Sequence, residues 1–402
     1  MNVPFSPPFI NEDMIAEVTE VLRSGWITTG PRTAKFETEL ASYTGVEQVV
    51  ALNSATAGLE LALRWYGIGE GDEVIVASYT YCASANVVLH TGAKVVLADV
   101  GEDFNIDVQQ IADLITDKTK AIIPVDFGGF PCDYEAIYAA VESKKGLFKP
   151  ASEKQEQLGR ILVLADSAHS LGAEYQGGKT GSCADFAAFS FHAVKNLTTA
   201  EGGALSVNLP APFNAEEVKK ELRKWSLHGQ SKDALAKTKV GGWRYDVDFP
   251  GYKCNMTDIQ AAIGIHQLKL YPEMLERREA IFDRYASAFS HELVPPYKTS
   301  TKRSSFHVFA LRVKGFTEAQ RDALIDLCAA EGVAVNVHFQ PLPLLTAYKN
   351  RGYRIEDVPK AFSMYANEVS LPVFYGMENG QVDRVIDVVS QSIKAIRSEA
   401  TT

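Results

Sequence analysis

Cysteine is scarce in this sequence of 402 residues, and its five copies are scattered, with no CxxC pair among them. The eight histidines form no HxxxH pair, so no zinc-ligand spacing is present and no metal site is predicted. An odd number of scattered cysteines is typical of a reducing compartment. We therefore expect a cytoplasmic protein without disulfides.

A net basic charge and long apolar runs are missing too. The net charge is −10. No apolar run approaches the ~18 residues of a membrane-spanning helix. The N-terminal stretch MNVPFSPPFINEDM lacks the basic start and apolar centre of a secretory signal. Nucleic acid and membranes are therefore not expected as partners.

The phosphate-binding motifs of common nucleotide cofactors are also absent. GIGEGD at 67–72 lacks the third glycine of GxGxxG and follows a helical pattern instead of a strand. Neither GxxxxGKS nor GxxxxGKT occurs. The sequence motifs that usually indicate NAD or ATP binding are therefore absent.

What is present, from about residue 47 to 207, is an alternation of short apolar stretches with helical patterns such as residues 55–67 and 132–143. Apolar residues on consecutive positions are typical of parallel strands covered on both faces. The predicted strands are QVVAL (48–52), EVIVAS (73–78), KVVLAD (94–99), AIIPVDF (121–127), ILVLAD (161–166), FAAFSF (186–191) and ALSVN (204–208). The alternation predicts an α/β fold with a mostly parallel sheet.

The pattern changes after about residue 255. A long helical pattern (256–289) is followed by FHVFALRV (306–313), a helix at 317–330, a strand-like VAVNVHF (333–339) and a helix at 379–396. We predict a large α/β domain over residues 1–250 and a smaller α+β domain over residues 251–402. In the first, residues 144–160 are charged and polar, as in a surface insertion, and residues 230–250 are predicted to form a lid-like loop.

Three functional side chains fall at or just after predicted strand ends, where open α/β sheets bind ligands: Asp166, Ser190 and Lys195. The strand ending at Leu52 leads through NSAT into a helix whose free amides suit a phosphate. Taken alone, that helix start is better explained as an N-cap by Ser54 or Thr56.

Together these features match the three groups by which proteins bind pyridoxal 5′-phosphate (PLP). Its phosphate needs the helix start and a hydroxyl, its pyridine nitrogen needs a buried carboxylate, and its aldehyde needs an amine. Lys195 stands near Phe191, His192 and Gly202, where desolvation would lower its pKa as Schiff-base formation requires. Lys195 is therefore the lysine predicted to bind PLP.

Seven motifs in order along the chain carry a family resemblance: SGWITTGP (24–31), NSATAGLELAL (53–63), DSAHSLGAEYQGGKTGS (166–182), FSFHAVKNLTTAEGG (189–203), LHG (227–229), PGYKCNMTDIQAA (250–262) and EVSLPVF (368–374). Through them the chain resembles the DegT/DnrJ/EryC1/StrS family of PLP-dependent sugar aminotransferases over nearly its whole length. The resemblance implies PLP fold type I, the architecture of aspartate aminotransferase, and a homodimer with shared active sites.

The resemblance implies a role for each matching residue. Lys195 would carry PLP and act as general base and acid, and Asp166 would pair with the pyridine nitrogen. His169 would contact the phenolic oxygen of the ring. Tyr81 would stack on the ring face.

The phosphate cradle is implied to consist of Ser190 and the backbone at Thr56 and Ala57. Asn255 matches a residue that reaches the cofactor phosphate of the neighbouring subunit. Here the chain has Lys253 and Asn255 where the commoner GYNYRM form has Asn and Arg. Which of the two side chains touches phosphate is left open.

Four further residues match positions on the substrate side, where each could also be a packing residue: Trp26, Thr29, His228 and His338. The implied reaction is a ping-pong transamination from L-glutamate to a nucleotide-linked keto sugar. FHAVKNLTTAEGG and GYKCNMTD are most similar to enzymes that aminate C4, which favours a UDP-4-keto-6-deoxy-N-acetylhexosamine and a 4-amino sugar nucleotide for surface polysaccharide.

Three alternatives compete with this interpretation. The first is amination at C3, and the second is a PLP-binding regulator or sensor without enzymatic activity. The third, a PLP-dependent sugar dehydratase, would carry histidine in place of the PLP lysine, so Lys195 argues against it.

Overall fold

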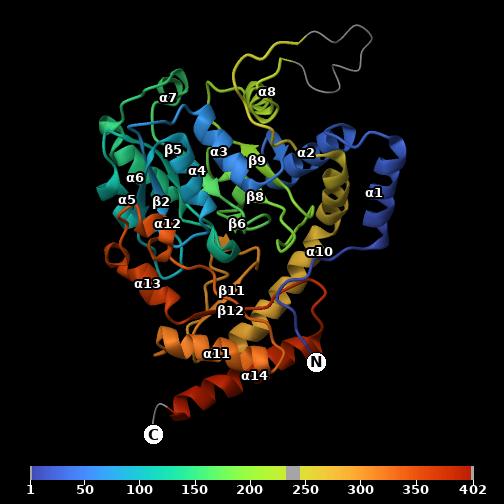
Figure 1. Ribbon diagram of the computed structural model, residues 1–402, viewed down its shortest axis with the longest axis vertical. Coiled ribbons are helices and arrows are strands. Elements are labelled where there is room, and N and C mark those ends of the chain that lie inside the picture. The colour runs from blue at the N-terminus through green and yellow to red at the C-terminus, as the bar shows by residue number, and fades with distance from the viewer. Residues whose placement is uncertain (1, 232–244, 400–402) are drawn as a thin grey trace.

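The structure is a computed structural model that describes residues 2–231 and 245–399. Its centre is a seven-stranded sheet with the order β1-β9-β8-β5-β4-β2-β3 (Figure 1). The strands are β1 (Gln48–Leu52), β2 (Glu73–Ala77), β3 (Lys94–Ala98), β4 (Thr119–Ile123), β5 (Leu162–Asp166), β8 (Phe186–Ser190) and β9 (Gly203–Val207). All run in one direction except β9, which is antiparallel to both of its neighbours. The predicted α/β fold with a mostly parallel sheet is confirmed.

Each face of this sheet has its own apolar core. Ala187 and Phe189 of β8 belong to one core, and Phe186 and Ala188 belong to the other, because successive side chains point to opposite faces. The helices over the first face are α2 (Pro31–Thr44), α5 (Val108–Leu114), α6 (Tyr134–Ser143) and α10 (Asp258–Ala288); those over the second are α3 (Ala55–Trp65), α4 (Ala83–Thr91) and α8 (Ala215–Ser226). This two-sided cover explains why the strands are apolar at consecutive positions.

The chain leaves the sheet through α10, which packs against α2, α1 (Glu12–Ser24) and α14 (Asn379–Glu399). A capping box of Thr257 and Gln260 fixes its start. Beyond it, β11 (Phe309–Arg312) and β12 (Glu368–Leu371) form an antiparallel pair beside α11 (Glu318–Ala330) (Figure 1). The short elements are β6 (Glu174–Tyr175), β7 (Gly178–Lys179), β10 (Lys302–Arg303), α7 (Glu153–Leu158), α12 (Thr346–Lys349), α13 (Pro359–Tyr365) and the 3-10 helices η1 (Phe127–Gly129), η2 (Lys145–Leu147), η3 (Thr180–Ser182), η4 (Leu342–Leu344) and η5 (Ile355–Asp357).

Two predicted strands differ from the structure. The strand-like stretch 333–339 is wrong as a strand: it makes only single bridges, among them Asn336 to Ser370. The strand predicted over 121–127 ends at Ile123, since Pro124 has no amide to continue the ladder.

The segment 144–160 is mostly exposed, yet it does more than cover the surface. It contains η2 and α7, and the buried Gln155 donates from Nε2 to the Tyr66 carbonyl at 3.2 Å. Of the predicted lid over 230–250, residues 232–244 lie outside the described residues. The domain division at residues 250 and 251 stays a prediction.

Within the described ranges, no helix is both long and apolar enough to cross a membrane.

Candidate active site

A cavity of about 370 Å³ opens at the edge of the sheet where the parallel strands end. The segments that follow β1, β2, β5 and β8 line it, together with residues near the N-terminus, such as Phe5, and residues beyond α10, such as His338. The predicted site residues in its lining are Thr56, Tyr81, Asp166, His169, Ser190, Lys195 and His338. The predicted residues outside its described lining are Trp26, Thr29, Ala57, His228 and Asn255.

Lys195 lies in a tight turn beyond β8. Its amide donates to the His192 carbonyl at 2.9 Å, and the buried ring of Phe191 anchors the start of the turn. Among the described residues, its Nζ has no hydrogen-bond or ion-pair partner. Burial lowers the pKa of Lys195 to about 8, although the nearby Asp166 acts in the raising direction. Such an amine has a neutral, nucleophilic fraction near physiological pH.

Asp166 is the last residue of β5, and its carboxyl group is buried next to the cavity. Ser84 Oγ donates to Oδ2 at 2.7 Å, and the Ala168 amide donates to Oδ1 at 3.2 Å. Burial raises the pKa of this carboxyl, while the hydrogen bonds from Ser84 and Ala168 act in the opposite direction. A cation bound in the cavity would find here a fixed, desolvated carboxylate partner.

His169 is held as a neutral ring. Its pKa lies well below the ordinary value, because burial and then the positive charge of Lys195 disfavour the imidazolium. The Gly128 amide donates to its Nδ1 at 3.3 Å, which leaves the ring proton on Nε2. Phe339 stacks on this ring at 5.6 Å, whereas Tyr81 stands 62% exposed at the cavity rim.

The start of α3 forms the hydroxyl-rich end of the cavity. Ser54 caps the helix by accepting from the Ala57 amide at 3.1 Å, so this amide is committed to the cap and not free for a ligand. Thr56 and Ser190 line the cavity beside it. A Cβ on Gly203 would lie 2.2 Å from the Ser54 carbonyl carbon, so β9 can approach the helix start only with glycine there.

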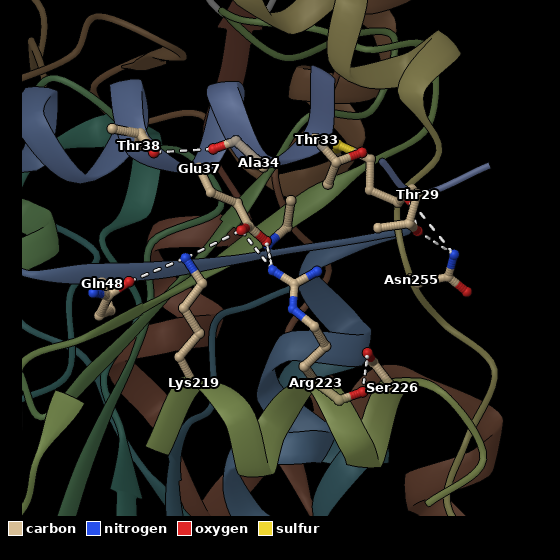
Figure 2. A network of polar contacts seen from close by, with 12 residues as sticks. Thr29, Thr33, Ala34, Glu37, Thr38, Gln48, Lys219, Arg223, Ser226 and Asn255 are labelled. Atoms are coloured by element: carbon tan, nitrogen blue, oxygen red, sulfur yellow. Dashed lines mark hydrogen bonds and ion pairs between the residues drawn. The ribbon is translucent and has the colours of Figure 1, made fainter. Parts of the chain in front are cut away.

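The strand that leads into this helix start is anchored from behind by Glu37 of α2 (Figure 2). The buried Glu37 carboxylate accepts from the Ala51 amide at 2.9 Å and forms ion pairs with Arg223 at 2.6 Å and Lys219 at 3.1 Å, both on α8. These contacts fix α2, β1 and α8 to one another. Ser54 and Thr56 therefore stand on a rigid support.

Asn255 lies outside the cavity and faces the loop between α1 and α2 (Figure 2). It donates from Nδ2 to Thr29 Oγ1 at 2.6 Å and accepts a hydrogen bond from Lys253 Nζ. Trp26 donates from Nε1 to the Thr29 carbonyl at 3.2 Å. His228 is exposed, and its amide donates to the Tyr252 carbonyl at 2.7 Å. Within one subunit, these residues form a group separate from Lys195 and Asp166.

Sequence reasoning missed several residues of the cavity. His307 contacts His169 with its ring centroid 4.4 Å away, and its Nδ1 is 2.8 Å from Asn196 Oδ1. Phe339, which also lines the cavity, was not expected, and neither was Ser84, which lies outside the described lining and donates to Asp166. The only indication in the sequence was that Ser84 lies close to Tyr81 and that Phe339 follows His338.

The profile of the DegT/DnrJ/EryC1/StrS aminotransferase family matches residues 8–390. The spore coat polysaccharide biosynthesis protein SpsC of Bacillus subtilis (strain 168) is 40% identical over 98% of this chain and 97% of its own length. The UDP-4-amino-4-deoxy-L-arabinose–oxoglutarate aminotransferase of Shewanella sediminis (strain HAW-EB3) is 34% identical, with coverages of 97% and 98%. The PMP form of Spr1654 from Streptococcus pneumoniae superimposes with a TM-score of 0.95 and 47% identity, over 98% of this chain and 100% of that one.

The fold and the site define a PLP-dependent aminotransferase of fold type I. The chain belongs to the DegT/DnrJ/EryC1/StrS aminotransferase family. The cavity fits the cofactor, since it brings together an unpaired amine, a buried carboxyl group and a helix start beside hydroxyls. When bound, PLP supplies an aldehyde that captures amines and a ring that withdraws electrons.

Proposed function

We propose that the enzyme transfers the amino group of L-glutamate to C4 of a UDP-linked 4-keto-6-deoxy-N-acetylhexosamine. The products are 2-oxoglutarate and a UDP-linked 4-amino sugar for surface polysaccharide. The observation that carries transamination is the Lys195 amine, of pKa about 8, which lies beside the buried Asp166 and has no hydrogen-bond or ion-pair partner in the part of the chain that the structure describes. The names of the Shewanella and Bacillus relatives support the UDP-4-amino sugar and the polysaccharide.

The protein's own groups divide the work as follows. Lys195 Nζ, once a substrate amine has taken its place, removes the proton from Cα of glutamate and later returns one at the sugar C4. The Asp166 carboxylate stabilises a protonated pyridine nitrogen. With PLP bound, His169 would donate from Nε2 to the ring oxygen, and Tyr81 would cover the ring face at the cavity rim.

The proposed enzyme is a homodimer in which each subunit completes the other's site. Lys195 is the only lysine or arginine in the described lining, so one subunit has no fixed cation to spare for phosphate groups. Apolar side chains stand exposed at the cavity rim, with Tyr81 at 62% and Val194 at 41%. An exposed apolar surface next to a site is typical of an interface. Lys253 and Asn255 of the second subunit would then supply the missing polar contacts.

Lys253→Ala and Asn255→Ala are expected to weaken PLP binding by about tenfold each, since each removes one hydrogen bond to a charged phosphate. The measurement is the PLP dissociation constant of the dimer, whose mass is determined by light scattering. Lys394→Ala, at an exposed position on α14, is the matched control. Unchanged PLP affinity in both variants would mean that the phosphate is held elsewhere.

The proposed function is tested first by the visible spectrum of the purified holoenzyme. L-glutamate should discharge the yellow absorption of lysine-bound PLP. A UDP-4-keto-6-deoxy-N-acetylhexosamine should restore it, and NMR of the product should place the new nitrogen on C4. If no amino acid changes the yellow absorption, the protein does not catalyse the proposed transamination. If NMR places the new nitrogen on C3, the proposed position of amination is wrong.

A further inference from the structure

A chain of buried hydrogen bonds runs from the cavity into the C-terminal part of the protein. His338 lines the cavity, and its Nδ1 lies 2.9 Å from Ser370 Oγ on β12. Ser370 Oγ lies 2.5 Å from Glu368 Oε1, and the His338 amide donates to Glu368 Oε2 at 3.1 Å. The other ring nitrogen of His338, Nε2, has no hydrogen-bond partner among the described residues and is not among the buried unsatisfied atoms. It is therefore free to meet a ligand in the cavity.

Within the described part of the chain, no cation forms an ion pair with the Glu368 carboxyl group. It is fully buried, and burial raises its pKa to about 8. The nearest guanidinium, Arg321 of α11, instead contacts the Glu368 backbone carbonyl at 3.3 Å and pairs with Asp322 at 2.7 Å. Tyr79 also faces this region: its hydroxyl donates to the His338 carbonyl at 2.8 Å, and burial raises the pKa of its phenol well above the ordinary value.

The protonation state of Glu368 decides which nitrogen of His338 carries the proton. An ionised Glu368 accepts from Ser370, which then accepts from Nδ1–H of His338, and Nε2 is left as an acceptor. A protonated Glu368 donates to Ser370, which then donates to Nδ1, and Nε2–H becomes a donor. Burial also lowers the pKa of His338 to about 4, so the ring is neutral in either state.

We propose that Glu368 is a positioning residue that, protonated and acting through Ser370, holds His338 with its proton on Nε2 and so aims a hydrogen-bond donor at the carbonyl oxygen of the keto substrate. The identity of that acceptor rests on the proposed function. The relay also explains why a carboxyl group is retained in an apolar setting on β12, where an unpartnered charge would be costly.

The test compares Glu368→Gln, Glu368→Ala and Ser370→Ala. Gln is the neutral isostere: its amide donates to Ser370, and its oxygen accepts from the His338 amide. We expect Glu368→Gln to keep kcat/KM for the keto substrate within about threefold of wild type at pH 7, and the other two variants to lose about tenfold. Above pH 8 the wild type should lose activity as Glu368 ionises, and Glu368→Gln should not. Lys195 titrates in the same range, so the difference between the two enzymes is the readout.

A second readout needs neither cofactor nor substrate. In an infrared titration of the apoprotein, a protonated-carboxyl band should vanish as the pH rises through about 8, and Glu368→Gln should lack that component. Asp126 and Asp166 also have raised pKa values, so only the component removed by Glu368→Gln counts. The inference is overturned if no such component exists, or if Glu368→Gln loses as much activity as Glu368→Ala. Failure of the proposed function would appear separately, as a wild-type holoenzyme that L-glutamate does not bleach.

Discussion

Lys195→Ala is expected to abolish turnover, with kcat falling roughly 1,000-fold or more. The variant loses the covalent attachment of PLP and the base that moves the proton at the donor Cα. No other lysine lines the described cavity, so no neighbouring amine can take over. The measurement is steady-state transamination, together with the visible spectrum after incubation with PLP.

Lys195→Arg separates the amine chemistry from the positive charge. It keeps a cation near Asp166 but has no nucleophilic amine, so it should be as inactive as Lys195→Ala. Lys394→Ala should behave as wild type. Transamination retained by Lys195→Ala would remove this residue from the mechanism and with it the interpretation of the cavity.

The depressed pKa of Lys195 should also govern the uptake of PLP by the apoenzyme. Only the neutral amine attacks an aldehyde, so the uptake rate should rise with pH and level off about one unit above 8. An ordinary lysine would continue to gain neutral amine up to its pKa of 10.5. The measurement is the rate of PLP uptake by stopped-flow absorbance at pH values from below 8 to above 10. A rate that still rises at the highest pH would show that burial does not lower the pKa of Lys195.

The central sheet could be predicted because burial on both faces leaves a strong trace in the sequence. Every residue of β2, β4 and β5 is buried, and each strand has at least three consecutive apolar residues. The reversed direction of β9 leaves no such trace, since a buried strand looks alike in both directions. The helix α1 was also not predicted; only Met14 and Val21 of its residues are buried.

Cavity residues that directly follow a predicted strand could be predicted from the sequence. Cavity residues that come from segments distant in sequence were not predicted. Asp166 and Lys195 follow apolar strands, so their place at the sheet edge could be inferred. His307 comes from a distant segment, and no local pattern indicates that it packs on His169. The alternating apolar residues of 333–339 resemble a strand, but His338 in that stretch turns into the cavity instead.

Asp166→Ala is expected to lower kcat about 100- to 1,000-fold, the usual cost of removing a preorganised group that stabilises charge in a water-excluded site. The carboxyl group is buried, so on its own its pKa is raised. A protonated pyridine nitrogen beside it would favour the carboxylate, and each charge would stabilise the other. Without Asp166, the ring nitrogen would lose its proton in these apolar surroundings and withdraw electrons less strongly.

Asp166→Asn tests whether the charge or the shape matters, because it keeps the size of the side chain and can still accept from Ser84. It should be nearly as impaired as Asp166→Ala, with PLP still bound to Lys195 and a shifted visible spectrum. Ser84→Ala removes only the 2.7 Å hydrogen bond to Oδ2 and should cost about tenfold. Near-normal rates in Asp166→Asn would show that the carboxyl group serves the fold of the β5 loop and not the cofactor.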